Sequence, residues 1–274
     1  MTRAHPRRVR AAMPHGLYRL IATQFCSALA DNALLIVGIA WLQAQGRPGW
    51  WAPLLKLSLT LAYVLLAPLV GPLADAWPKA RVMAAMNALK VLAVLALMAG
   101  LHPLLAFALL GIGAAAYAPA KYGLVTELAG EHQLVAANGW LEVTVVAAVL
   151  LGAALGGALV SPALLQGLAP RLLDGLGLAG TAPLQVSAAL VLALHGVAAW
   201  LNVGLPDSGA RYARCAWHPG ALTRELAGAQ RALWRDADGG LSLAVTTLFW
   251  GVSAVMQFAV IRWAGEELGL SLSQ

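Results

Sequence analysis

The sequence has 274 residues, of which 60% are hydrophobic and only 11% are charged, and its formal net charge is +6. Soluble globular domains do not normally have this composition, so we expect an all-α polytopic membrane protein. A β-barrel is disfavoured because barrel strands alternate apolar and polar side chains, whereas these apolar runs are continuous over about twenty residues. The excess of cations indicates a positive-inside bias and contact with membrane lipids, and not the binding of nucleic acid.

Seven continuous apolar runs predict seven transmembrane helices, each near the ~20 residues that a bilayer core requires. The runs cover residues 17–43, 52–76, 79–100, 103–128, 134–160, 184–205 and 241–265. We therefore expect an N-terminal tail at 1–16, a six-helix bundle at 17–205, a linker at 206–240, a seventh helix at 241–265 and a final segment at 266–274. The final segment resembles a loop that leads to a further helix, so we expect a truncated product.

Lysine and arginine side chains gather on one side of these spans. That side holds the N-terminal tail, the turn before the third span, and the linker with its five arginines, Arg211, Arg214, Arg224, Arg231 and Arg235. The opposite loops offer little beyond Arg47, Lys56 and Arg171. Because basic loops stay in the cytoplasm, we predict that the tail and the linker are cytoplasmic.

The linker also carries a helical pattern. Its apolar residues Leu222, Leu226, Ala229 and Leu233 recur at helical spacing, with arginines on other faces. This pattern predicts an amphipathic helix that lies on the cytoplasmic surface of the membrane.

The first span contains a carboxylate, Asp31, followed by Asn32. Ionisable side chains inside apolar spans are costly and are functional candidates by default. Gln24, Ser27 and Asp31 are spaced i, i+3 and i+7, so they share one helix face that points away from lipid. The alternative is a structural carboxylate, neutralised by a proton or by an interhelical pair.

Three more ionisable side chains lie inside the predicted spans. Lys121 follows the helix-loosening Pro119 in the fourth span, and snorkelling to the headgroups is the alternative to a role in binding. Lys90 lies in the third span and Glu142 in the fifth. They are candidates for a structural ion pair with each other, for substrate binding, or for carrying a proton or ion. On the seventh span, Gln257 belongs to a polar stripe that we expect to face the cavity.

Residues 71–81 form a polar break between the second and third spans. Gly71, Asp75, Lys79 and Arg81 have the spacing G-x-x-x-D-x-x-x-K-x-R. We expect them to act as a gate that holds two halves of a transporter closed on the cytoplasmic side through charge and helix-end contacts. Much of the partner surface is expected to come from later helices, which leaves this segment partly unpaired.

Nothing in the sequence indicates an enzyme. Cys26 lies in the first span and Cys215 in the basic linker, so neither a disulfide nor a metal site is expected. The H-x-x-x-x-D pairing of acyltransferases and the Ser-His-Asp arrangement are both missing, and a retinal protein is excluded because no lysine follows Lys121. No cofactor is expected. The lone histidines are expected at interfaces or in loops: His102, His132, His195 and His218.

The polar segments together resemble a known family. The resemblance is carried by residues 31–35, 71–81, 87–90, 113–123 and 137–142. Residues 71–81 are similar to the loop between the second and third helices of the major facilitator superfamily. The segments A-D-N-A-L-L and Y-A-P-A-K-Y-G narrow this to its lysophospholipid transporter (LplT) branch.

The resemblance implies a major facilitator fold, with the N-terminal six-helix bundle and the first helix of the second half. It implies a flippase of the bacterial inner membrane that returns lysophospholipids, such as lysophosphatidylethanolamine, from the outer to the inner leaflet, where a lysophospholipid acyltransferase uses them. The family's cavity pairs an acidic residue of the first helix with basic residues of the fourth and seventh. Asp31 and Lys121 match the first two, whereas Gln257 stands where an arginine is expected. Arg262 lies on another face.

The main alternative is another major facilitator, a proton-coupled antiporter of a drug or a small metabolite. In that protein Asp31 or Glu142 would titrate during transport. Substrate-driven proton flux without movement of lysophospholipid would favour this alternative.

Overall fold

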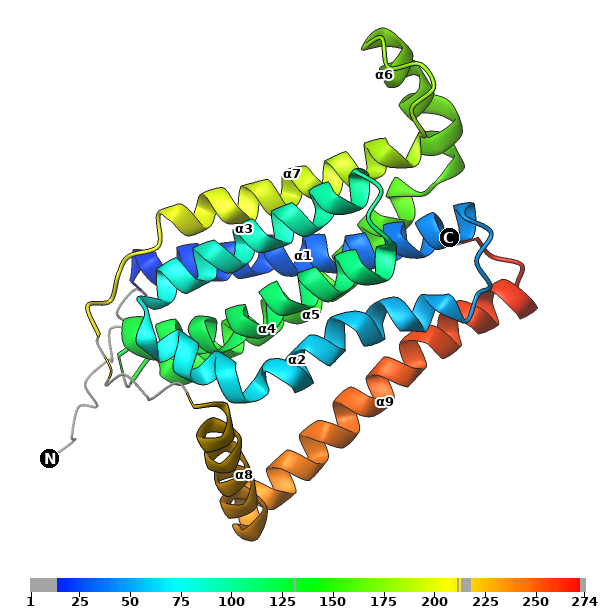
Figure 1. Ribbon diagram of the computed structural model, residues 1–274. Helices are drawn as coiled ribbons and strands as arrows, with labels where there is room; N and C mark the ends of the chain where they lie inside the picture. Colours follow the sequence, from blue (N-terminus) through cyan, green and yellow to red (C-terminus); the bar gives the residue numbers. More distant parts are fainter. Residues whose placement is uncertain (1–13, 131, 211, 213–217, 272–274) are drawn as a thin grey trace, which may run out of the picture.

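The computed structural model describes residues 14–130, 132–210, 212 and 218–271. Several residues named above lie outside this part of the chain: the tail up to residue 13, Arg211, Arg214, Cys215 and residues 272–274. Within the described part all regular structure is helical (Figure 1).

In the described part of the chain, seven helices are long and apolar enough to cross a membrane, which confirms the prediction of an all-α polytopic fold. They are α1 (His15–Ala44), α2 (Trp51–Ala76), α3 (Lys79–Met98), α4 (Pro103–Leu128), α5 (Leu134–Leu159), α7 (Leu184–Val203) and α9 (Ala237–Glu267). Their bounds differ from the predicted ones by about one helical turn or less. The shorter helices are the π-helix η1 (Ala163–Leu168), α6 (Ala169–Gly175) and α8 (Pro219–Arg235).

Local sequence explains where several helices begin. Pro103 stands at the start of α4, and the ring nitrogen Nδ1 of His102 accepts a hydrogen bond from the Leu104 backbone at 3.3 Å. Asp236 caps α9 by accepting a hydrogen bond from the Gly239 backbone at 2.7 Å. The sequence did not predict η1 and α6, because the apolar residues between the fifth and sixth spans are too few to span a bilayer.

The first six membrane helices pack in a two-fold pattern. Helix α1 packs on α5 and α7, while α4 packs on α2 and α3, and α3 also meets α7. Exchanging α1 with α4, α2 with α5, and α3 with α7 leaves this set of contacts unchanged. This contact pattern is the one expected of two inverted three-helix repeats.

Glycines allow the closest of these contacts. A Cβ at Gly156 of α5 would lie 2.7 Å from the Cβ of Ile36 and 2.9 Å from the Ala33 carbonyl oxygen on α1. At the related contact, a Cβ at Gly111 of α4 would lie 2.8 Å from the Cα of Leu59 on α2. At Gly111 the two backbones touch directly, and at Gly156 the glycine packs against the Ala33 carbonyl oxygen and the Ile36 side chain, as small residues permit in membrane bundles.

The interior of the bundle has two apolar clusters with a polar layer between them. One cluster is built around Leu34, Val94 and Phe107, and the other around Leu20, Met83 and Leu124. Most of the buried polar side chains lie along α1, α3, α4 and α7 between or beside these clusters: Thr23, Gln24, Ser27, Asn87, Lys90, Lys121, His195 and Asn202.

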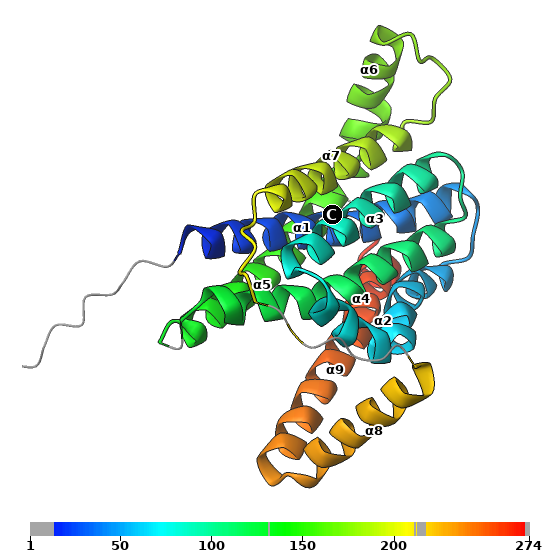
Figure 2. The same ribbon diagram turned by 60° about the vertical axis from the view of Figure 1, so that its left-hand side comes forward.

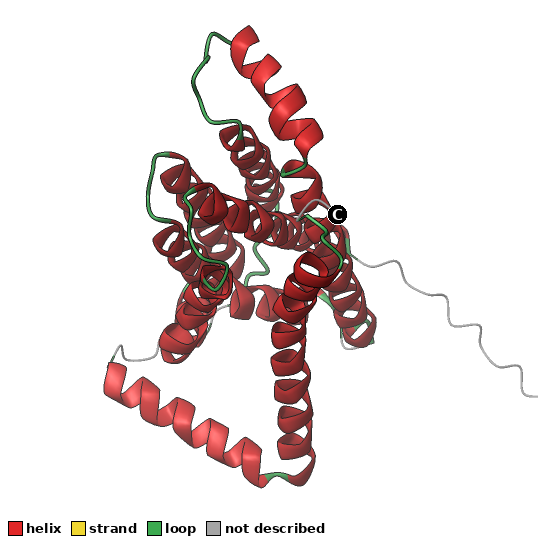
Figure 3. Ribbon diagram, turned by 90° about the vertical axis from the view of Figure 1, so that its right-hand side faces the viewer, coloured by secondary structure: helices red, strands yellow, loops and turns green. Residues whose placement is uncertain are grey.

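Helices α8 and α9 lie beside this bundle and touch it at few places, chiefly through α2. They meet in a V, and α9 then runs along one side of the bundle toward its opposite end (Figures 1 and 3). Leu222 of α8 is buried, but none of the central stretch of α9 is. Residues 163–181, with η1 and α6, project sideways from the end of the bundle at which α7 begins (Figures 1 and 2).

The glycine contact between α5 and α1 gives a test. Gly156→Ala should lower the free energy of unfolding by about 1–3 kcal/mol, because the added methyl group collides with the Ala33 carbonyl oxygen and the Ile36 side chain. Gly139→Ala, on the same helix with open space around it, should leave stability unchanged or raise it by up to about 1 kcal/mol through helix propensity. Thermal unfolding in detergent measures both, and equal effects of the two substitutions would contradict the packing described here.

Candidate functional site

The polar layer surrounds a small cavity of about 70 Å³ inside the bundle. Its walls come from α1, α2, α3 and α4, and its polar lining consists of Gln24, Ser27, Asp31, Tyr63, Lys90, Tyr117 and Lys121. The cavity has room for a few water molecules and for no lipid headgroup with its chain. Four of the seven residues predicted for substrate binding therefore meet here: Gln24, Asp31, Lys90 and Lys121.

A buried ion pair crosses this cavity. The Lys90 ammonium lies 2.5 Å from Oδ2 of Asp31 and also donates a hydrogen bond to the Ser27 hydroxyl at 3.0 Å. The Lys90 side chain is almost fully buried, whereas about a fifth of the Asp31 side chain is exposed, at 21%. Each charge satisfies the other, which makes both tolerable within a membrane-spanning bundle.

This pair corrects one prediction. The pairing of Lys90 with Glu142 is wrong, because Lys90 points into the bundle toward α1 while Glu142 lies on an exposed face of α5. Glu142 instead accepts a hydrogen bond from the Tyr122 hydroxyl at 3.1 Å. A polar chain continues from Lys90 toward α7: Ser27 donates to Asn87 at 3.3 Å, and Asn87 donates to Asn202 at 3.4 Å.

His195 is a site residue that the sequence analysis missed. It was expected at an interface or in a loop, but it is 2% exposed in the middle of α7. Its Nε2 lies 3.2 Å from Oδ1 of Asp31, in an orientation too poorly aligned for a hydrogen bond, and neither ring nitrogen has a hydrogen-bond partner among the described residues. The signal that could have found it is the one used for Asp31, an ionisable group inside an apolar span.

Lys121 is the other cation of the cavity. Only 6% of the residue is exposed, and its ammonium lies 4.2 Å from the centre of the Tyr122 ring. Within the described part of the chain it has no ion-pair partner. The structure thus places Lys121 in the cavity wall, with Asp31 lining the same space.

Asn32 does not take part in the cavity. Its side-chain amide donates to the Ala28 carbonyl oxygen at 2.8 Å, and a Cβ at Gly152 of α5 would lie 2.7 Å from the Asn32 Cβ. Asn32 therefore faces α5, one position around the helix from Asp31.

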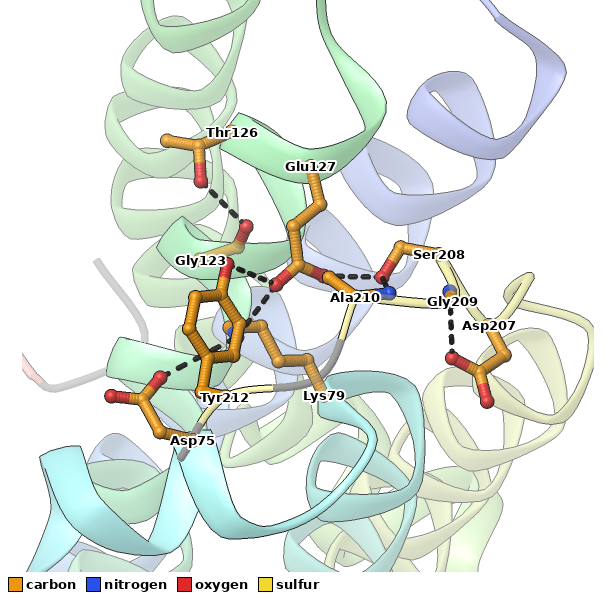
Figure 4. A network of polar contacts seen from close by, with 10 residues as sticks. All are labelled: Asp75, Lys79, Gly123, Thr126, Glu127, Asp207, Ser208, Gly209, Ala210 and Tyr212. Atoms are coloured by element: carbon orange, nitrogen blue, oxygen red, sulfur yellow. Dashed lines mark hydrogen bonds and ion pairs between the residues drawn. The ribbon is translucent and has the colours of Figure 1, made fainter. Parts of the chain in front are cut away.

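The predicted gate is split between two helices, with a break only at Trp77 and Pro78. Gly71 and Asp75 lie in the last turns of α2, and Lys79 and Arg81 in the first turn of α3. The Lys79 ammonium lies 2.6 Å from Oε1 of Glu127 at the end of α4 and 3.5 Å from Asp75 (Figure 4).

These contacts pair part of the predicted gate within the six-helix bundle. Lys79 finds its carboxylate at Glu127 of α4. Arg81 is exposed and has no ion-pair partner among the residues that the structure describes. Gly123 has a part in this arrangement, because a Cβ there would overlap the aliphatic stem of Lys79, 2.8 Å from its Cδ.

Glu127 also binds the start of the linker, which the sequence did not predict. It accepts hydrogen bonds from the Ser208 hydroxyl at 2.5 Å and from the Tyr212 hydroxyl at 3.0 Å (Figure 4). The Lys79 ammonium lies 4.0 Å from the centre of the Tyr212 ring. The hydrogen bond to Glu127 and the negative charge of its carboxylate raise the pKa of the Tyr212 phenol above its ordinary value.

Comparison with known proteins shows which proteins the chain is similar to. No protein-family model matches it. It is 37% identical over 259 residues to the lysophospholipid transporter LplT of Yersinia pestis (strain Pestoides F), an alignment that covers 94% of this chain and 59% of the relative. The same values hold for LplT of Yersinia pseudotuberculosis serotype O:3 (strain YPIII). The chain thus spans 59% of the length of these curated relatives.

Among solved structures, a bacterial homologue of the human lysosomal transporter Spinster, in an inward-facing and unoccupied conformation, matches with a TM-score of 0.66 and 16% identity. The match covers 96% of this chain and 58% of that chain. The chain is a sequence relative of the LplT transporters and has the major facilitator fold. This confirms the expected fold class and the resemblance on which it rested.

The LplT resemblance predicts a cation on the seventh helix, where this chain has Gln257. The structure places Gln257 outside the cavity lining, at the contact of α9 with α2, where it accepts a hydrogen bond from the Lys56 ammonium. Arg262 is exposed and pairs with Glu266 at 2.8 Å. Neither residue of α9 supplies a charge to the Asp31 cavity.

The buried ion pair gives a prediction about stability. Lys90→Met leaves the Asp31 carboxylate without its ion pair, and breaking one side of a buried pair costs about 3–5 kcal/mol. The free energy of unfolding in detergent micelles should fall by this amount. The double variant Asp31→Asn, Lys90→Met should recover most of the loss, and a double variant as unstable as Lys90→Met would contradict the pairing.

The contact between Glu127 and the linker gives a prediction about titration. Glu127→Gln removes the negative charge that opposes the phenolate, so the pKa of Tyr212 should fall toward its ordinary value. Nuclear magnetic resonance of ¹³C-labelled tyrosine measures the shift. Glu266→Gln, a similar change on α9, should leave the pKa of Tyr212 where it is, and the idea fails if the two variants titrate alike.

Proposed function

We propose that this chain belongs to a secondary transporter that moves lysophospholipids from the outer to the inner leaflet of the bacterial inner membrane by alternating access. The observation that carries the proposal is the charged cavity inside the six-helix bundle, combined with the similarity to LplT. A membrane protein that keeps two cations and a carboxylate around one internal space has the groups that a zwitterionic headgroup requires.

Lys121 is the proposed partner of the substrate phosphate. It is the cavity cation that lacks an ion pair among the described residues, and a phosphate would supply a charge-assisted partner for it. Asp31 is the proposed partner of the substrate ammonium, which would exchange with Lys90. Gln24 lines the same space and can donate or accept a further hydrogen bond.

The size of the cavity supports alternating access. At about 70 Å³ it cannot hold a whole lysophospholipid, so the substrate enters only when helices separate. The contacts of Lys79 with Glu127 and Asp75 provide a closed end for the bundle, and the proposed gate consists of Gly71, Asp75, Lys79 and Arg81.

The proposed orientation follows from the positive-inside rule. In the described residues, Lys79, Arg81 and the arginines of α8 lie on the same side, which we assign to the cytoplasm together with the N-terminus. The inner membrane is the proposed location, and a lysophospholipid acyltransferase acting on the delivered lipid is the proposed functional link.

The headgroup assignment can be tested in proteoliposomes that contain the protein. Lys121→Met should slow the flipping of labelled lysophosphatidylethanolamine roughly ten- to hundredfold, the range for a lost charge-assisted hydrogen bond. Lys56→Met makes the same change outside the cavity and should flip at the original rate. Equal rates for Lys121→Met and the unchanged protein would remove Lys121 from the binding site.

His195 gives one specific reason to keep the proton-coupled antiporter as a second candidate. Its buried imidazole lies 3.2 Å from the Asp31 carboxylate, and a proton-coupled antiporter would need two such neighbouring groups to relay a proton. Substrate-driven acidification inside vesicles, abolished by His195→Gln and seen with a small metabolite or drug but not with lysophospholipid, would favour the antiporter. Lysophospholipid flipping that is independent of a proton gradient would favour the flippase.

A further inference from the structure

An apolar slot lies at the edge of the bundle, apart from the charged cavity. It is enclosed by the end of α3, the start of α7 and the side of α6, and its volume is about 550 Å³. Met98 and Ala99 line it from α3, Leu172, Leu173 and Leu176 from α6, and Ala189 from α7. The volume falls within the ~300–1,000 Å³ of ordinary ligand sites, and the lining is apolar as in most of them.

The slot offers almost no polar group to a ligand. Its only polar lining side chains are Thr181 and Gln185, and the Gln185 amide already donates to the Met98 carbonyl oxygen at 3.0 Å. Leu176 is 72% exposed at its mouth. An apolar site with an exposed leucine at its edge favours a hydrocarbon ligand, because burying each methylene group contributes about 0.8 kcal/mol to the free energy of binding.

The size of the slot suits one acyl chain. A cavity of ~150 Å³ binds benzene, so 550 Å³ has room for on the order of twenty carbon atoms. One acyl chain therefore fills the slot.

The position of the slot and the charge of Arg171 indicate that the ligand is a lipid. Helices α3 and α7 both cross the membrane, and the slot lies at the ends of these spans, where hydrocarbon meets headgroups. Helix α6 lies across the direction of the bundle helices at this end and projects past them (Figures 1 and 2). Arg171, next to the lining residue Leu172, is exposed and has no ion-pair partner in the described part of the chain, so its charge complements a lipid phosphate.

We infer that this slot holds the acyl chain of a single-chain phospholipid in the outer leaflet, with its phosphate at Arg171, before the lipid reaches the charged cavity. The inference rests on the proposed function, because it uses the proposed orientation and substrate class. It assigns residues 163–189 a role as a collecting site for substrate.

The test uses a lysophosphatidylethanolamine with a photoactivatable group on its acyl chain, in proteoliposomes containing the unchanged protein. Irradiation and mass spectrometry should place the label on the peptide that holds Leu172, Leu173 and Leu176. Ala189→Trp fills the slot and should reduce this labelling to background. Ala193→Trp, one turn further along the exposed side of α7 and outside the slot lining, should not reduce it.

The phosphate contact has its own variant. Arg171→Gln should reduce labelling by the phospholipid probe roughly two- to fivefold, the range for an exposed ion pair. Labelling by a photoactivatable fatty alcohol, which has no phosphate, should be unchanged. Equal loss with both probes would overturn the role of Arg171.

Three outcomes would overturn the binding of a single-chain lipid in the slot. The first is labelling that Ala189→Trp leaves unchanged, and the second is equal labelling by a two-chain phospholipid, which indicates ordinary boundary lipid. The third is no labelling of the peptide, which indicates that another polypeptide covers the leucines. Labelling does not depend on flipping, so the two proposals fail separately. A protein that flips the probe without labelled α6 refutes the slot alone, and one that is labelled but does not flip refutes the proposed function alone.

Discussion

The pairing of Lys90 with Asp31 is the constraint around which the interior of this bundle is built. Neither charge is tolerable inside a membrane-spanning bundle by itself, so the two must meet. From Lys90, hydrogen bonds through Ser27, Asn87 and Asn202 extend the polar layer from α1 to α7. This polar layer separates the two apolar clusters, and the space left within it is the cavity. Lys121 enters the same space with no ion pair to any residue that the structure describes, which is the basis for proposing it as the partner of a ligand phosphate.

The same requirement acts at the end of the bundle. Lys79 is 7% exposed, and its charge is met by Glu127 and Asp75, while Glu127 also receives two hydroxyl groups from the start of the linker. One carboxylate at the end of α4 thus joins α3 to the segment that follows α7. The path of the chain between the bundle and α8 therefore begins at a fixed point.

The sequence was sufficient for the helices and for which ionisable residues matter, and insufficient for how they pair. An apolar run that is long enough to cross a bilayer predicts a helix directly. Among structures that are not closed barrels, only a helix gives every backbone N–H and C=O group a hydrogen-bond partner in hydrocarbon. The face shared by Gln24 and Asp31 follows from helical spacing alone. Pairing depends on which helices are neighbours, and so the sequence assigned Lys90 to Glu142 and placed His195 at an interface. Glu127 was missed for the same reason: its partners Lys79 and Ser208 come from α3 and from beyond α7.

The glycine contacts of α5 with α1 and of α4 with α2 bear on how such a bundle can move. Where a side chain separates two helices, the helices can slide by small changes of rotamer. At Gly111 the facing atoms all belong to the Leu59 backbone, and at Gly156 they are the Ala33 carbonyl oxygen and the first atoms of the β-branched Ile36 side chain, which has little rotamer freedom. If one helix slid past the other by a fraction of a turn, a residue with a larger side chain would replace the glycine at the contact, where there is room only for the glycine Cα hydrogen. Sliding of α5 against α1, and of α4 against α2, is thereby resisted at two symmetry-related places.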